Sequence, residues 1–109
     1  MAVVLPYRAT TATGACFEIS FPLHPETSST VRVSQMLTAL LQALDREVQL
    51  DRNTSNGDIL QSLAMALAIR ASMIEAPKAL TDRLSMDLVS VALDAMNEAD
   101  RHYVQLGHA

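Results

Sequence analysis

The sequence predicts an α+β domain in which a short N-terminal antiparallel β element, of two or three strands, precedes a three-helix bundle. Half of the 109 residues are apolar, which is the composition of a chain that folds around a core. Aromatic residues make up only 4% and Trp is absent, which favours packing of Ala- and Leu-rich helices over a β sandwich. The length fits one domain, residues 1–109, with the β element in residues 1–33 and three helices in residues 34–109.

The first third of the chain carries the strand signals, because β-branched and aromatic residues gather there with three of the four prolines. We expect strands at residues 2–8 and 15–21, joined by a turn at residues 10–14. Residues 30–33 are expected to add a short third strand.

Two features of these strands predict how the sheet is placed. Alternation in the second strand turns Phe17, Ile19 and Phe21 toward the core and Cys16 toward the other face. Pro6 predicts that the first strand lies at an edge, because proline has no N–H to donate to a neighbouring strand.

From residue 34 onward the apolar residues recur at helical spacing. Ser34 is the expected N-cap of a first helix, whose apolar face consists of Leu37, Leu40, Leu41, Leu44 and Val48. A second helix is expected to begin at Ser55, because Asp58 three residues later resembles a capping box, and to run to about residue 76.

The third helix is expected to begin at Pro77, because proline suits the first helical turn. Its apolar spacing predicts that it extends to Tyr103 or Gln105.

On that helix Glu98 and His102 would lie one turn apart, where two such side chains can approach a divalent metal. Two ligands do not make a site, so we expect no metal and a solvated contact instead.

The second and third helices each carry more apolar surface than one stripe. The second helix has one stripe at Leu60, Leu63, Leu67 and Ile74, and another on the opposite side at Met65, Ile69 and Met73. The third helix adds to its main stripe an adjoining one at Val89, Leu93 and Met96. Either the strands cover these additional stripes, or a second subunit does. We expect a homodimer whose interface includes these six residues: Met65, Ile69, Met73, Val89, Leu93 and Met96.

Charge and cysteine content exclude several classes of partner. The net charge is −4 and Lys78 is the only lysine, so nucleic acid and anionic membrane surfaces are not expected partners. The longest apolar stretch, residues 63–69, is far shorter than a membrane span. The N-terminal residues lack the pattern of a signal peptide, and Cys16 is a single cysteine, so we expect a cytoplasmic protein.

No sequence pattern points to an enzyme or to a cofactor. The chain contains no glycine-rich phosphate loop, no Gly-x-Ser-x-Gly elbow and no His-Glu-x-x-His pattern. A thiol-dependent enzyme would need Cys16 to meet His24, His102 or His108, and no local spacing arranges this.

We therefore expect a small non-enzymatic interaction or accessory protein that works as a homo-oligomer and also binds a protein partner. The alternative is a sensor or carrier of a small anionic ligand, oriented by Arg70, in a pocket between helices or at a subunit interface. Arg70 is the candidate because its helical position lies beside Leu63 and Ile74 of the first stripe. Its structural alternatives are a carboxylate partner such as Glu47, or contact with solvent. A third hypothesis is a thiol-dependent enzyme that uses Cys16 and a histidine.

Overall fold

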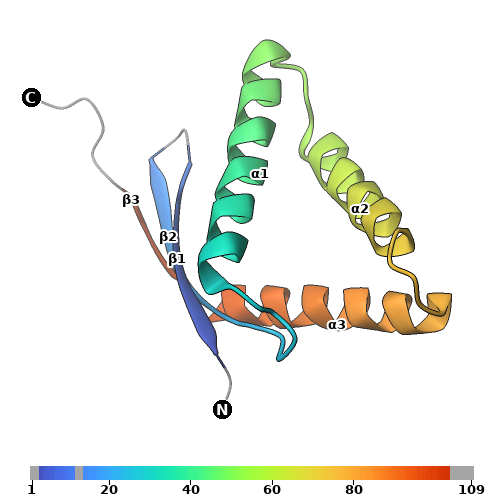
Figure 1. Cartoon of the computed structure of the whole chain (residues 1–109). Helices are drawn as coiled ribbons and strands as arrows, with labels where there is room; N and C mark the ends of the chain where they lie inside the picture. The colour runs from blue at the N-terminus through green and yellow to red at the C-terminus, as the bar shows by residue number, and fades with distance from the viewer. Residues whose placement is uncertain (1–2, 12–13, 104–109) are drawn as a thin grey trace, which may run out of the picture. The chain divides into compact units, whose positions relative to one another are not determined.

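The computed structural model describes residues 3–11 and 14–103 (Figure 1), and the chain divides into two compact units. The first unit consists of Met1–Leu37 and Ser90–Ala109, and the second of Thr38–Val89. The elements follow in the order β1 Val4–Thr10, β2 Ala15–Pro22, α1 Thr30–Leu50, α2 Asn56–Ser72, α3 Lys78–Asn97 and β3 Asp100–Tyr103. A three-stranded antiparallel sheet combined with three helices confirms the predicted α+β class.

The sheet supplies the core of the first unit. Strands β1 and β2 form a hairpin in which Leu5 lies opposite Phe21 and Tyr7 opposite Ile19. Leu5 and Ile19 are buried, whereas Phe17 and Phe21 are half-buried. The prediction of an inward face is thus confirmed for Ile19 and only in part for Phe17 and Phe21. The expectation that Cys16 lies away from the core was wrong, because the Cys16 side chain is only 1% exposed.

Pro6 lies where its missing N–H is tolerated. The strand order is β1-β2-β3, so β1 is at an edge of the described sheet, as expected. Leu23 N–H donates to Val3 O and Thr11 N–H donates to Ala15 O, so odd-numbered residues of β1 direct their backbone groups toward β2. Pro6 is even-numbered and its nitrogen faces away from β2, where a proline also discourages edge-to-edge pairing.

Strand β3 corrects the predicted end of the third helix. α3 ends at Asn97, and residues 100–103 pair with β2, with Arg101 opposite Phe17. The Arg101 guanidinium lies 5.2 Å from the centroid of the Phe17 ring, a cation–π contact across the two strands. The prediction of a helix at residues 100–103 was wrong. Their backbone groups pair with a strand some 80 residues earlier in the chain, and local periodicity does not report such a distant partner. Residues 104–105 lie outside the described residues.

The predicted strand at residues 30–33 is also wrong, because these residues form the first turn of α1. Ser29, not Ser34, provides the cap: its Oγ accepts from Arg32 N–H at 3.1 Å, and its carbonyl accepts from Val33 N–H. This capping satisfies N–H groups that would otherwise lack partners, and it outweighs the strand preference of the β-branched residues.

The capping box of α2 is confirmed. Asp58 N–H donates to Ser55 Oγ at 3.0 Å, and Ser55 N–H donates to Asp58 Oδ2 at 2.9 Å. α2 ends at Ser72, about one turn earlier than expected. α3 begins directly after Pro77, whose carbonyl accepts from the N–H groups of Leu80 and Thr81.

The second unit has no apolar core of its own in this structure. Of residues 38–89, which are all described, only Thr81 is buried, and its hydroxyl donates to Lys78 O. α2 has no buried residue along its 17 residues. Helices in proteins derive most of their stability from packing an apolar face. The second unit therefore leaves unburied the surface that would stabilise it.

Two glycines test this description of the backbone. Gly14 has a φ of 89°, whereas Gly57 lies in the first turn of α2, where an added Cβ meets only Ser55 Oγ at 3.6 Å. Gly14→Ala should lower the free energy of unfolding by about 1–2 kcal/mol, because an L side chain is strained at positive φ. Gly57→Ala should leave it unchanged or raise it by up to about 1 kcal/mol. Denaturant unfolding at one fixed protein concentration measures both, and equal effects would contradict the assigned conformation of Gly14.

Candidate functional site: the apolar surface of the helices

The apolar stripe at Met65, Ile69 and Met73 is exposed in the single chain. These three side chains are 57%, 60% and 61% exposed. The opposite stripe of the same helix is also uncovered, with Leu60, Leu63, Leu67 and Ile74 all exposed. The second unit therefore presents apolar side chains around most of the circumference of α2.

The few polar side chains of α2 do little to make this surface hydrophilic. Ser62 Oγ donates to Asp58 O and Ser72 Oγ donates to Ala68 O, both at 2.8 Å, so each hydroxyl proton is directed back to the helix itself. Between Asp58 and Arg70 no residue of the helix is charged. α2 therefore carries charge only in its first and last turns.

The predicted interface residues of α3 are exposed as well. Val89 belongs to the second unit, and Leu93 and Met96 belong to the first. Leu93 is 64% exposed, and Val89 and Met96 are each 38% exposed. Ala95, in the same unit as Leu93, is buried, so within that unit one side of the helix is covered and Leu93 is not.

Arg70 lies on the exposed surface of α2 and donates from Nη1 to Met73 Sδ. Its backbone position lies beside Leu63 and Ile74, and its guanidinium reaches the end of the other stripe at Met73. This position corresponds to the expected alternative in which Arg70 reaches solvent.

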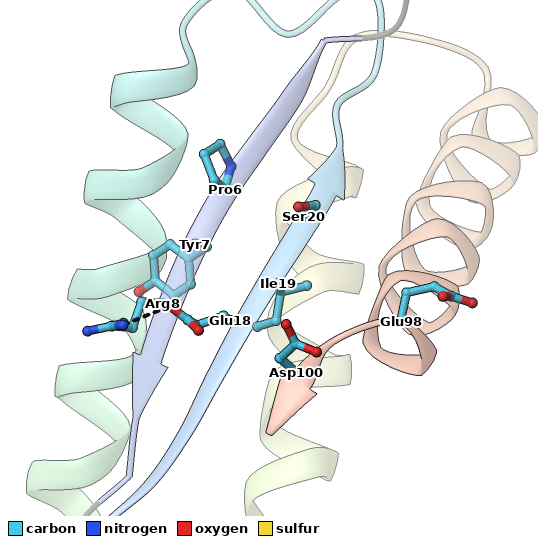
Figure 2. Close-up of a pocket in the computed structure, with 8 residues that line it drawn as sticks. All are labelled: Pro6, Tyr7, Arg8, Glu18, Ile19, Ser20, Glu98 and Asp100. Atoms are coloured by element: carbon cyan, nitrogen blue, oxygen red, sulfur yellow. Dashed lines mark hydrogen bonds and ion pairs between the residues drawn. The ribbon is translucent and has the colours of Figure 1, made fainter. Parts of the chain in front are cut away.

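A separate hollow of about 430 Å³ lies on the sheet of the first unit (Figure 2). Its lining residues are Pro6, Tyr7, Arg8, Glu18, Ile19, Ser20, Glu98 and Asp100. Arg8, Glu18 and Asp100 are cross-strand neighbours in one row over three strands. Sequence reasoning missed this row, although the hairpin register, set by the turn, would have placed Arg8 opposite Glu18.

Arg8 and Glu18 form an exposed ion pair with Nη2 and Oε1 separated by 2.7 Å. The hydrogen bond from Arg8, and then its positive charge, lower the pKa of Glu18 from its ordinary value of 4.5. The same hydrogen bond raises the pKa of Arg8. The arrangement keeps both groups charged, which suits a structural pair across two strands and not a proton donor.

The candidate thiol site is only partly assembled. Cys16 and His102 are cross-strand partners, a pairing that sequence spacing alone did not reveal. The thiol is only 1% exposed, and Thr10 Oγ1 contacts Cys16 Sγ at 3.8 Å. A nucleophile must reach its substrate, so burial argues against catalysis by Cys16. Of the other two histidines, His24 accepts a hydrogen bond from Glu26 N–H through Nδ1. His108 lies outside the residues that the structure describes.

The expected helical spacing of Glu98 and His102 does not occur, because Glu98 follows the end of α3 and His102 lies in β3. Within residues 3–11 and 14–103 no group of three His, Cys, Asp or Glu side chains is placed to hold a metal ion. In the same part of the chain, no helix combines the length and apolar character needed to cross a membrane.

No protein-family model matches the chain, and neither curated proteins nor solved structures give a significant match.

The ion pair predicts a defined pH dependence. Because folding lowers the pKa of Glu18, its stabilising effect is fully present above the ordinary value of 4.5 and is lost as the pH falls through the lowered value. Arg8→Gln should return the Glu18 midpoint toward 4.5 in an NMR titration. Arg83→Gln, which removes an equal charge on α3, should leave it unchanged. An unaltered midpoint in Arg8→Gln would contradict the assigned pair.

Proposed function

We propose that this chain is a small non-enzymatic interaction protein that acts as a homo-oligomer, a dimer in its simplest form, through its apolar helical surfaces. The observation that supports this most directly is the lack of any buried apolar side chain in residues 38–89. Contiguous apolar patches beyond a few hundred Å² are uncommon on soluble monomers and usually mark interaction sites. Helical surfaces of this kind suit either a second copy or a helix of another protein.

The charge of the chain supports a protein as the further partner. A net charge of −4 with a single lysine opposes binding to the phosphates of nucleic acid or to an anionic membrane. A single buried cysteine is compatible with a reducing compartment, and we place the protein in the cytoplasm on that ground.

The two other hypotheses have weaker support. An anionic ligand would favour an enclosed basic pocket, whereas Arg70 lies on an exposed helix surface beside Met73. A thiol-dependent enzyme would need access to Cys16, which is buried. The proposal therefore rests on the helical surfaces and assigns no catalytic residue.

Charge placed in the apolar stripe of α2 should weaken association. At tens of micromolar, wild-type protein is expected to sediment as a dimer or larger species. Ile69→Asp should raise the dissociation constant by about 100-fold or more, because a desolvated, unpaired carboxylate costs several kcal/mol. Leu93→Asp tests α3 in the same way. Asn56→Asp is the matched control, because it adds equal charge to an exposed position of α2 on the side away from the stripe.

Sedimentation equilibrium and circular dichroism together measure the outcome, the second to confirm that each variant remains helical. A monomer mass for wild-type protein at tens of micromolar would reject the proposed self-association.

A further inference from the structure

The charges of α2 have opposite signs at its two ends. Asp58 lies in the first turn and Arg70 in the last turn, and the 11 residues between them carry no charge. Their Cα atoms are separated by 12 residues, or about 18 Å along the helix axis. Each charge is opposite in sign to the end of the helix dipole beside it, since the acidic residue lies at the positive N-terminal end and the basic residue at the negative C-terminal end.

We propose that α2 packs antiparallel against α2 of a second copy of this chain, about a two-fold axis near Ala64. This inference rests on the proposed self-association and specifies the surface and the direction. In this arrangement Asp58 of each helix lies level with Arg70 of the other, because residue 64 is their midpoint. A parallel pair would bring like charges together at both ends, so charge complementarity selects the antiparallel pair.

The stripe at Met65, Ile69 and Met73 is the contact face. Asp58 and Ser62 continue this stripe toward the N-terminus at helical spacing, and the Ser62 hydroxyl is directed to Asp58 O. Arg70 lies at the side of α2 between the two stripes, and its guanidinium reaches the contact face at Met73 Sδ. Both charges are therefore adjacent to the face that would be covered, and each would reach the opposite charge of the second copy at the rim.

The two-fold axis fixes which positions meet. In the antiparallel pair, a residue and its symmetry mate are separated along the helix axis by twice the offset of that residue from residue 64, at about 1.5 Å per residue. Met65 would lie about 3 Å from its mate along the axis, and Ile69 about 15 Å from its mate. In a parallel pair in register, both residues would be level with their mates.

Site-directed cross-linking tests the direction. In a Cys16→Ser background, Met65→Cys and Ile69→Cys are treated with a short bifunctional thiol reagent that spans about 8 Å, close to the separation of packed helices. We expect covalent dimer from Met65→Cys and at least about tenfold less from Ile69→Cys under the same conditions, because 15 Å exceeds the reach of the reagent. The background protein should form none.

The outcomes separate the two proposals. A sedimentation mass of two chains with efficient cross-linking of both variants indicates a parallel pair and overturns the antiparallel inference alone. Dimer mass with neither variant cross-linked places the interface on another surface and also overturns it. A monomer mass overturns the proposed self-association itself.

Arg70 provides an independent test of charge complementarity. Arg70→Gln should raise the dimer dissociation constant by about fivefold at low salt, as expected for the loss of two rim ion pairs, and the difference should shrink at 1 M salt. Arg83→Gln removes an equal charge from an exposed position on α3 and should have no effect. Equal behaviour of the two variants would contradict the role of Arg70.

Discussion

The burial of apolar helical surface is the constraint on which this structure depends. Folding a helix fixes backbone dihedrals at a large entropic cost, and apolar burial supplies most of the compensating free energy. The sheet of the first unit meets this requirement with Leu5, Ala15, Cys16 and Ile19, all buried. The second unit, with Thr81 as its single buried residue, does not meet it by its own packing. A second copy that covers α2 would supply the missing burial.

The first unit shows how contacts between distant segments organise this chain. The segments up to Leu37 and from Ser90 onward belong to the same unit. β3 pairs with β2 there, and the Arg101 guanidinium lies over the Phe17 ring. Pro6 at the outward-facing position of β1 makes pairing at this edge of the sheet unfavourable.

Local signals in the sequence predicted those parts of the fold that local interactions determine. The Ser55 and Asp58 capping box, the two strands of the hairpin and the edge position of Pro6 all follow from neighbouring residues. β3 was missed because its partner is distant in sequence, and the start of α1 was misplaced because capping by Ser29 outweighed β propensity. The Arg8–Glu18 pair required the hairpin register, and the Cys16–His102 pairing required β3. The apolar stripes of α2 are readable from periodicity, but what covers them depends on packing that periodicity does not describe.

Amide hydrogen exchange at two protein concentrations tests the central claim most directly, because exchange reports the opening of each segment separately. If a second copy covers α2, protection of the amides in residues 59–72 should rise with protein concentration across the dissociation constant, since mass action stabilises the covered state. Amides of β2 should remain equally protected at both concentrations, because their partners lie within the chain. Equal protection of α2 at high and low concentration would contradict the account.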